Sequence, residues 1–429
     1  MSTHSSDSTG STRQLSRRIA RGLARRLRDF AAEPEVEIDY SDIPRADVAL
    51  YFADAPAKLY QLTQWLPVFE AQTSIRSFVV VRNTETAQIL SSLTSLPVLC
   101  VQRYETLMSL YDRADFHAVI YVNNGWTNFQ SLSFQQAVHI HVNHGESDKI
   151  CMVSNQAKAY DKVFVAGEAA VRRHAAALAW FDDSHLVRVG RPQLDLAIPP
   201  ALPAHTGPTI TYAPTWEGED DANNYTSVDR YGPQIIQAAL AQPGARVIYK
   251  PHPRVAMSSD PGVMQGHRAI LDSLSKARTA NPGVGHQILL DADVLGVIRS
   301  TDIMIADVSS VSLDHLYLRP ESPLLICDRR SDRDRLLQDA PVASGCHVID
   351  ASSIGSLDAD LAAIIADDTL RQKRLDLRNF YFDGLAPGES TDRFWAALRH
   401  EMHAHDEALQ SLSRVRILDV DTARTGDAE

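Results

Sequence analysis

The sequence lacks the features of several protein classes. It has four cysteines, Cys100, Cys151, Cys327 and Cys346, and no Cys-x-x-Cys pair. This spacing argues against a zinc site or a disulfide framework and predicts buried free thiols. No run of about 18 apolar residues is present, so no segment is predicted to span a bilayer. The first ten residues are polar and resemble no secretion signal, so we expect a cytoplasmic protein.

Basic residues are also in a minority. Lysine and arginine number 42 against 54 acidic residues, which gives a formal net charge of -12. Proteins that bind nucleic acids generally present basic surfaces, so we predict no nucleic-acid partner. The composition, 44% hydrophobic and 22% charged, is typical of a globular protein. A length of 429 residues predicts two or three domains.

The N-terminal region differs in charge from the rest of the chain. Residues 1–12 are rich in serine and threonine and predict a disordered tail. Residues 13–31 then place apolar side chains at helical spacing between seven arginines, which predicts a basic amphipathic helix. Two interpretations stay open. Residues Arg13 to Phe30 either bind an anionic membrane surface, which would place the protein peripherally on the inner face of the cell membrane, or pack on their own domain.

Apolar strand-like runs alternate with helical segments from residue 46 onward. The alternation predicts two Rossmann-like, doubly wound α/β domains. We place the N-terminal domain at 45–195, a proline-rich linker at 196–208 and the C-terminal domain at 209–385. A C-terminal helix over 386–415 and a flexible tail over 416–429 complete the predicted organisation. The strands are expected at 47–52, 77–81, 97–101, 117–122, 137–142, 162–166, 186–189, 209–212, 246–250, 287–290, 303–305 and 323–327.

Four polar segments each follow a predicted strand directly. They are His144-Gly145-Glu146-Ser147-Asp148-Lys149, Ala213-Pro214-Thr215-Trp216, Lys250-Pro251-His252-Pro253 and Asp307-Val308-Ser309-Ser310. Open α/β sheets bind ligands at the carboxyl ends of their strands. The last segment leads from a buried strand into a helix, whose N-terminus favours a phosphate; a plain helix cap is the alternative. Imidazole suits proton transfer near neutral pH.

With these four segments, in this order, the sequence resembles the CDP-glycerol:poly(glycerophosphate) glycerophosphotransferase family of teichoic-acid and capsule polymerases. The family motifs have the forms His-Gly-x-x-x-Lys, Ala-Pro-Thr-Trp, Lys-x-His-Pro and Asp-x-Ser-Ser, and the resemblance covers roughly residues 115–395. It implies a GT-B-like fold, in which two Rossmann-like domains face a cleft. It also implies that the C-terminal domain holds the CDP-linked donor and the N-terminal domain the acceptor.

The resemblance further implies roles for individual residues. His144 matches the family's general base, and His252 matches the histidine that stabilises the donor pyrophosphate. Donor or phosphate contacts are implied for Lys250, Asp307, Ser309, Ser310, Thr215 and, in a late Ser-x-x-Arg element, Arg393. Acceptor-side positions are Gly145, Glu146, Ser147, Asp148 and Lys149. For Lys149 and Lys250, the alternative is a solvated position on the surface. Histidine and lysine charges suffice for this transfer, so we expect no metal or other cofactor.

Three features depart from the family pattern or compete with it. Glu146 stands where threonine or serine is usual, and with Asp148 it either raises the pKa of His144 or binds an acceptor hydroxyl. An acidic run, 217–221, follows the second motif where a basic residue is more usual. Asp291-Ala292-Asp293 resembles an Asp-x-Asp metal site, although its position between a strand and a helical run favours a helix cap.

The sequence therefore predicts a transferase that moves a glycerophosphate or related alditol-phosphate unit from CDP-glycerol to a cell-surface polymer or lipid-linked acceptor. The reaction would release CMP during teichoic-acid-like or capsule polymer synthesis. Two alternatives stay open. One is a GT-B glycosyltransferase or nucleotide-sugar 2-epimerase that uses a sugar nucleotide. The other is a catalytically inactive protein that binds polymer precursors.

Overall fold

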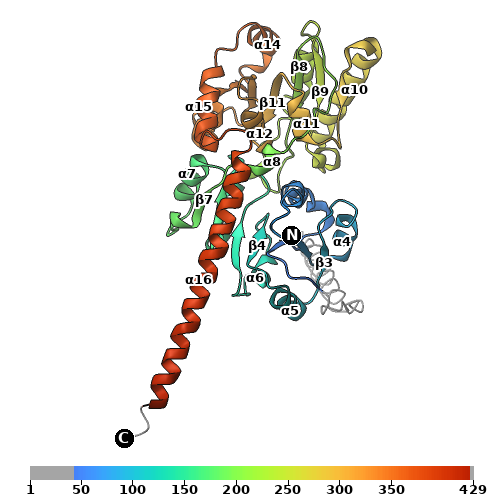
Figure 1. Ribbon diagram of the computed structural model, residues 1–429. Helices are drawn as coiled ribbons and strands as arrows, with labels where there is room; N and C mark the ends of the chain where they lie inside the picture. Colours follow the sequence, from blue (N-terminus) through green and yellow to red (C-terminus); the bar gives the residue numbers. More distant parts are fainter. Residues whose placement is uncertain (1–42, 426–429) are drawn as a thin grey trace, which may run out of the picture. The chain divides into compact units, whose positions relative to one another are not determined.

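The computed structural model describes the backbone of residues 43–425 and the side chains of residues 43–412 apart from residue 150. The predicted tail at 1–12 and basic helix at 13–31 lie outside the described residues. From Arg45 onward the chain forms one compact unit that contains two parallel β-sheets with helices on both faces (Figure 1). Within residues 43–425, no helix is both long enough and apolar enough to cross a bilayer.

The first sheet has seven parallel strands in the order β3-β2-β1-β4-β5-β6-β7. They are β1 (Val48–Phe52), β2 (Ser77–Val81), β3 (Val98–Cys100), β4 (Ala118–Tyr121), β5 (Val138–His141), β6 (Lys162–Val165) and β7 (Leu186–Arg188). The helices of this region are α2 (Tyr60–Thr63), α3 (Leu66–Glu70), α4 (Thr84–Leu90), α5 (Tyr104–Ala114), α6 (Asn128–Ser131) and α7 (Glu168–Ala177). Its central strands read as continuous apolar runs because both faces are covered.

The second sheet has six parallel strands in the order β10-β9-β8-β11-β12-β13. They are β8 (Thr209–Ala213), β9 (Arg246–Tyr249), β10 (Gln287–Ile288), β11 (Ile303–Asp307), β12 (Leu324–Cys327) and β13 (His347–Ile349). After α8 (Pro192–Asp195), the helices are α9 (Gly232–Leu240), α10 (Pro261–Ala280), α11 (Val294–Arg299), α12 (Ser310–Leu318), α13 (Arg333–Asp339), α14 (Leu357–Ala366), α15 (Arg371–Phe382) and α16 (Glu389–Thr425).

Short 3-10 helices complete the connections. They are η2 (Pro56–Lys58), η3 (Ile150–Met152), η4 (Asn155–Ala159), η5 (Asp183–His185), η6 (Asp221–Asn223), η7 (Pro253–Met257), η8 (Pro282–Val284), η9 (Pro341–Gly345) and η10 (Ile354–Ser356). Each sheet starts in its middle and is extended first to one side and then to the other. This is the doubly wound order of Rossmann-like domains, so the predicted fold class is confirmed.

The structure differs from the sequence prediction in several elements. β13 was not predicted, because a strand of three residues gives too short a pattern to recognise. The helix α10 was also missed, although Asp260 caps it and a proline occupies its first turn. Residues 57–70 have helical periodicity, but the structure divides them into η2, α2 and α3. Cys151 is exposed, so the prediction of buried thiols is wrong for this residue.

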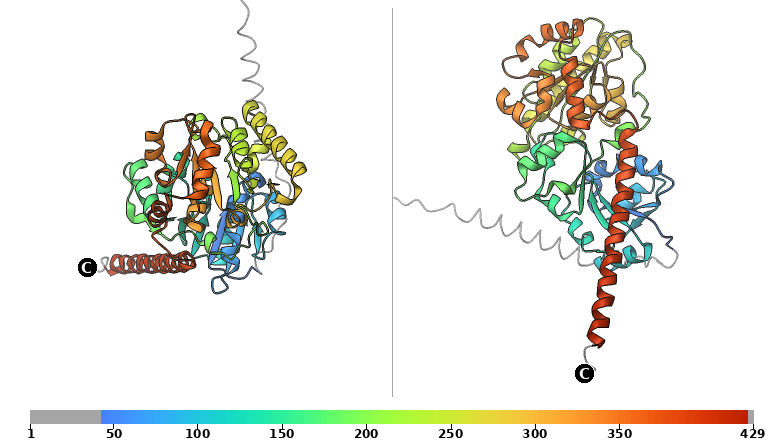
Figure 2. Two further views of the ribbon diagram at one scale, coloured as in Figure 1. Left: turned by 90° about the horizontal axis from the view of Figure 1, so that it is seen from above. Right: turned by 60° about the vertical axis from the view of Figure 1, so that its left-hand side comes forward.

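The helix α16 joins the end of the chain to the first sheet. It continues past residue 415, where the predicted helix stops, and it lies beside the strands of this sheet over its first turns (Figure 2). Phe394, Trp395 and Leu398 are buried in the same apolar core as β1, β2 and β4. A second core contains residues of α7, from the first region, and of α12, from the second. Part of the packed interior therefore belongs to both regions. The two sheets are therefore connected by more than the linker between them.

Candidate active site

The four polar segments all follow strands at the carboxyl edges of the two sheets. The second sheet reverses its direction of growth between β8 and β11, and residues 214–216 and 308–310 follow these two strands. Residues 250–253 follow β9, which pairs with β8. The loops on either side of such a reversal diverge and leave a crevice in which open α/β sheets bind ligands. Three of the four predicted segments thus lie at or beside this switch point.

A tight turn after β5 positions His144. Asn143 adopts a left-handed φ of 54°, which asparagine tolerates better than most residues, and its Oδ1 accepts the N–H of His144 at 2.8 Å. The Nδ1 of His144 lies 3.3 Å from the carbonyl oxygen of Val122. Because a carbonyl only accepts, Nδ1 carries the proton and Nε2 carries the lone pair. Burial lowers the pKa of His144 to about 4, so the ring is neutral near pH 7.

The second histidine has the opposite tautomer. His252 follows β9, and its Nδ1 accepts the backbone N–H of Arg254 at 3.2 Å. Its Nε2 therefore carries the proton and donates. Burial, together with the nearby positive charge of Lys149, lowers the pKa of His252 to about 3. The site thus contains one neutral imidazole that can accept a proton and another that can donate a hydrogen bond.

One tyrosine contacts both histidines. The ring centroids of His144 and His252 are each 5.9 Å from that of Tyr60, at interplanar angles of 87° and 90°. Tyr60 begins α2, and 37% of its surface is exposed. The structure therefore brings the two predicted catalytic residues, one from each sheet, to a single aromatic ring. The sequence prediction did not include Tyr60.

A chain of hydrogen bonds links the first motif to the second and fourth. The Nζ of Lys149 donates to Oγ1 of Thr215 at 2.9 Å, and the N–H of Thr215 donates to Oδ2 of Asp307 at 2.8 Å. The hydroxyl of Ser147 accepts the N–H of Lys149 at 3.2 Å. Burial raises the pKa of Asp307 to about 7. Asp307 is fully buried, so its carboxylate contacts the loop that carries Thr215 and not the solvent.

The turn after His144 also contacts the first turn of α12. A Cβ on Gly145 would lie 3.3 Å from Cβ of Ser310, so a side chain here would crowd the helix. Ser309 is the N-cap of α12 and is 6% exposed. Its Oγ is buried and has no hydrogen-bond partner among the described residues. The helix N-terminus therefore presents a buried hydroxyl beside the His144–Gly145 turn.

The two carboxylates of the first motif pair with one arginine. Arg173 of α7 lies 2.5 Å from Oε1 of Glu146 and 2.7 Å from Oδ1 of Asp148. The second oxygen of Asp148 accepts the hydroxyl of Tyr381. The expectation that these carboxylates raise the pKa of His144 is wrong, because burial lowers that pKa. Both carboxylates are buried in their pairing with Arg173.

Lys250 contacts backbone rather than a carboxylate. Its Nζ lies 3.3 Å from the carbonyl oxygen of Pro251 and 3.4 Å from that of Leu290, and burial lowers its pKa. Asp293 accepts the N–H of Leu295 at 3.1 Å, which confirms its interpretation as a helix cap of α11. Among the described residues, no group of three or more histidine, cysteine or acidic side chains is arranged to hold a metal ion.

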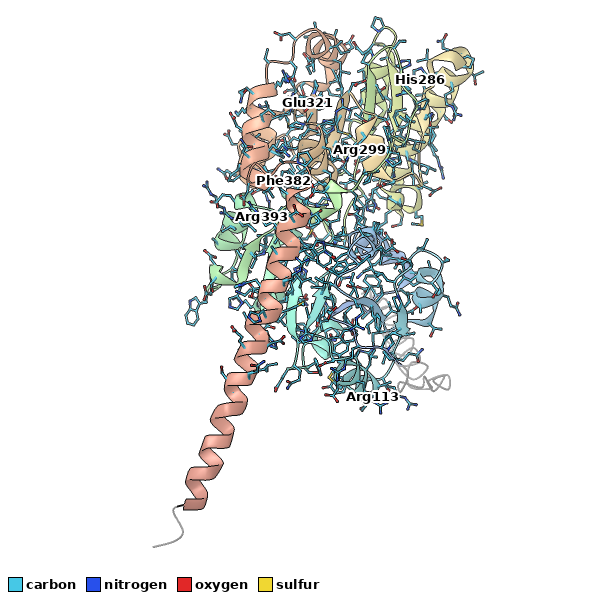
Figure 3. The ribbon with its side chains drawn as sticks, viewed as in Figure 1. Arg113, His286, Arg299, Glu321, Phe382 and Arg393 are labelled. Atoms are coloured by element: carbon cyan, nitrogen blue, oxygen red, sulfur yellow. The ribbon has the colours of Figure 1, made fainter. Side chains whose placement is uncertain are left out.

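Arg393 is the one predicted site residue that the structure does not bring to this cluster. It lies at the beginning of α16 (Figure 3), and its NH1 is 3.3 Å from Oδ2 of Asp383. Asp383 also pairs with Arg188 at 3.3 Å. The neighbouring Phe394 and Trp395 are buried in the first core, which leaves Arg393 on the outer side of the helix with 43% of its side chain exposed.

Sequence reasoning missed three residues of this region, Tyr60, Arg173 and Arg191. Arg191 follows Gly190 directly after β7, as the recognised motifs follow their strands, so its position alone was a usable signal. Tyr60 lies in the connection after β1, at the same edge of the sheet. Arg173 lies in the middle of α7 and gave no signal, because only the folded chain places it against the first motif.

The geometry of these motifs agrees with a family comparison. A family model described as CDP-Glycerol:Poly(glycerophosphate) glycerophosphotransferase matches residues 73–326. The chain belongs to this family. The resemblance inferred from the four motifs is therefore confirmed, and the protein is an enzyme of the CDP-glycerol glycerophosphotransferase type. No curated protein sequence matches this glycerophosphotransferase.

Solved structures share the fold of this glycerophosphotransferase at low sequence identity. The wall teichoic acid polymerase TagF is 13% identical, with 93% of this chain and 99% of that chain covered and a TM-score of 0.55. A TagF variant soaked with CDPG is 12% identical, with the same coverage and a TM-score of 0.54. A putative UDP-N-acetylglucosamine 2-epimerase from Listeria monocytogenes is 14% identical, with 84% and 97% covered and a TM-score of 0.56. These likenesses support the GT-B-like fold.

Proposed function

We propose that the enzyme transfers a glycerophosphate unit from CDP-glycerol to a hydroxyl of a cell-surface polymer or lipid-linked acceptor and releases CMP. One observation carries this proposal. Two neutral imidazoles of opposite tautomer, His144 and His252, lie at the same ring of Tyr60. A transfer between a neutral hydroxyl and a diphosphate needs one group that accepts a proton and another that donates to a phosphate oxygen.

On the acceptor side, Nε2 of His144 takes the proton of the attacking hydroxyl. The acceptor oxygen then forms a bond to the phosphorus that carries the glycerol. The carbonyl of Val122 keeps the Nδ1 proton in place, so Nε2 remains the basic nitrogen. The pKa of His144, lowered by burial to about 4, keeps the base unprotonated at neutral pH.

On the donor side, the bond between this phosphorus and the bridging oxygen breaks, and CMP leaves with the electron pair. The Nε2–H of His252 donates to the departing phosphate, and Lys149, Thr215 and Lys250 lie on the same side of the site. Buried cations and preorganised donors stabilise charge that develops in a transition state. We propose that these groups act without a metal, so activity should persist in excess EDTA.

A group of polar side chains next to His144 suits an acceptor with several hydroxyls. The side chain of Asn123 donates to Asp54 at 2.9 Å and to Gln61 at 2.8 Å. Asn123 directly follows Val122, whose carbonyl holds His144. Carboxylate and amide oxygens accept hydrogen bonds from hydroxyl groups. We therefore place a polyol or sugar end of the acceptor at this edge.

A panel of donors tests the proposal. The purified enzyme is incubated with CDP-glycerol, a second CDP-alditol and a UDP-sugar, with and without a glycerophosphate-primed acceptor, and released nucleotide is measured. We expect acceptor-dependent CMP from CDP-glycerol. Release of UDP would favour a sugar-nucleotide enzyme, and an epimerised UDP-sugar without transfer would favour an epimerase. Binding of CDP-glycerol without turnover on any acceptor would favour an inactive binding protein.

We also propose that the enzyme works at the inner face of the cell membrane, where capsule or teichoic-acid precursors are extended. The support is the sequence pattern of Arg13 to Phe30, whose arginines and apolar stripe suit an anionic lipid surface. A variant without residues 1–31 should lose co-sedimentation with anionic vesicles and retain turnover on a soluble acceptor. Equal sedimentation of both proteins, or sedimentation with neutral vesicles alone, would rule this out.

A further inference from the structure

Arg191 begins the connection between the two sheets and is buried there. Gly190, just before it, has a φ of 75°, and a Cβ on this glycine would collide with Ser390. The chain therefore turns sharply at the end of β7, and Arg191 is directed inward with only 5% of its surface exposed. A charged residue that is this well buried normally has its charge paired and its donors hydrogen-bonded.

The guanidinium of Arg191 is only partly paired. Its NH2 lies 3.2 Å from Oδ1 of Asp314, and its Nε donates to Oε1 of Gln193 at 3.4 Å. Neither NH1 nor NH2 forms a hydrogen bond of acceptable geometry within the residues that the structure describes. Unsatisfied buried donors of a charged group are costly. The arrangement suggests that an acceptor-rich ligand completes this site.

The unpaired end of Arg191 lies beside the N-terminus of α12. Its NH1 is 3.7 Å from the position of a Cβ on Gly145, and that same position is 3.3 Å from Cβ of Ser310. The buried hydroxyl of Ser309, also without a hydrogen-bond partner among the described residues, caps this helix of nine residues. A helix N-terminus, two hydroxyls and a guanidinium together match the oxygens of a phosphate.

We propose that Arg191 binds the phosphate that carries the glycerol, which is the phosphate that the enzyme transfers. This inference rests on the proposed function. Gly145 directly follows His144 and lies against both Arg191 and Ser310, so a phosphate at the N-terminus of α12 lies next to the base. Lys149, with Thr215, serves the phosphate that leaves with CMP. Two different groups of side chains thus bind the two phosphates of the donor, one group containing Arg191 and the other containing Lys149.

A purely structural role for Arg191 makes a different prediction. If the residue only pairs with Asp314, removing either partner has similar consequences. If it binds the transferred phosphate, the change Asp314→Asn frees the guanidinium and leaves donor affinity the same or higher. The change Arg191→Lys keeps one positive charge and loses the planar fork, so its effect should lie between wild type and Arg191→Ala.

The experiment measures the affinities of wild type, Arg191→Ala, Arg191→Lys and Asp314→Asn for CMP and for CDP-glycerol by calorimetry. Thermal unfolding of each protein is recorded alongside. CMP retains only the phosphate that leaves. We expect Arg191→Ala to weaken CDP-glycerol binding at least about tenfold and to change CMP binding less than about twofold, as expected for hydrogen bonds to a charged group. If Arg191→Ala does not fold, Arg191→Lys replaces it, with a loss of about threefold or more.

Three results would overturn the proposal. They are an equal loss of CMP and CDP-glycerol affinity, no loss for CDP-glycerol, or a loss in Asp314→Asn as large as in Arg191→Ala. A wild-type protein that binds neither nucleotide would instead reject the proposed function itself. Binding of CDP-glycerol that is insensitive to Arg191 rejects only this inference.

Discussion

The carboxyl edges of the two sheets have contrasting chemistry. Around β8, β9 and β11, the chain presents Lys250, His252, Thr215 and the hydroxyls of Ser309 and Ser310 at a helix N-terminus. Around β4 and β5, it presents the neutral ring of His144 and the side chain of Asn123, which donates to Asp54 and Gln61. The carboxylates of Glu146 and Asp148 on this edge both pair with Arg173. One edge suits an anion and the other suits a neutral hydroxyl.

In the proposed function, this contrast separates the donor from the acceptor. A diphosphate gains from cations and N–H donors, whereas an acceptor hydroxyl needs a neutral base and hydrogen-bond acceptors. Lys149 is the exception, because it belongs to the first sheet and donates to Thr215 of the second. Lys149 therefore adds a positive charge to the edge of the second sheet, the edge that suits an anion.

Replacing either histidine should abolish most turnover but should affect binding differently. We expect His144→Ala and His252→Ala each to reduce CMP release at least about 100-fold, the lower range for loss of a general acid or base. Only His252→Ala should also weaken CMP binding, since only His252 lies on the anion side. His403→Ala, on the exposed surface of α16, is the control and should behave as wild type. Near-normal turnover in either site variant removes that histidine from the mechanism.

Removing Arg173 should destabilise the acceptor edge. Arg173→Met leaves Glu146 and Asp148 buried without their partner, so we expect about 3–5 kcal/mol less free energy of unfolding. Urea denaturation measures the change. The triple variant Arg173→Met, Glu146→Gln and Asp148→Asn should recover part of this loss, because it removes the unpaired charges. A single variant within about 1 kcal/mol of wild type would show that the pairing contributes little.

Removing the charge of Lys149 should weaken donor binding. We expect Lys149→Met to raise the KM for CDP-glycerol about tenfold, which corresponds to loss of a charge-assisted hydrogen bond. The KM for the acceptor should stay the same. Lys158→Met is the control, since Lys158 is an exposed lysine that donates to the carbonyl of Ala179. A change in acceptor KM alone would place Lys149 on the acceptor side instead.

Acidification should destabilise both halves of the molecule. His141 in β5 and His315 in α12 are buried, and burial lowers the pKa of each to about 3. The unfolded chain binds these protons near pH 6.5, so the folded state is favoured above that pH and loses stability as the pH falls toward 3. We expect up to about 1.4 kcal/mol per pH unit for each histidine. His315→Gln should show a shallower dependence than wild type in urea denaturation between pH 7 and 5. Identical slopes would contradict this.

The smallest expected effect concerns the polar group beside His144. Asp54→Asn keeps the shape of the side chain and removes its charge. We expect the acceptor KM to rise about threefold to tenfold, the scale of one hydrogen bond, while the donor KM stays unchanged. Gln61→Ala should act in the same direction. A change in donor KM in either variant would show that the two edges do not divide the substrates as proposed.

Much of the site was predictable because its signals are local. The segments that begin at His144, Ala213, Lys250 and Asp307 each join a buried apolar run to polar residues, and parallel sheets place all such junctions at one edge. The sequence also predicted the two doubly wound domains. It missed β13, whose three residues give no pattern, and α10, whose capping residue was not recognised.

The sequence by itself determined every strand except β13, the polar ends of the strands and the types of side chain available for transfer. Only the tertiary structure decided which charges are paired. It placed Arg173 against Glu146, Tyr60 against two histidines, Arg191 beside α12, and Arg393 on the outer side of α16. These outcomes depend on contacts between residues far apart in the chain. Periodicity and capping signals extend over only a few residues, so they carry no information about such contacts.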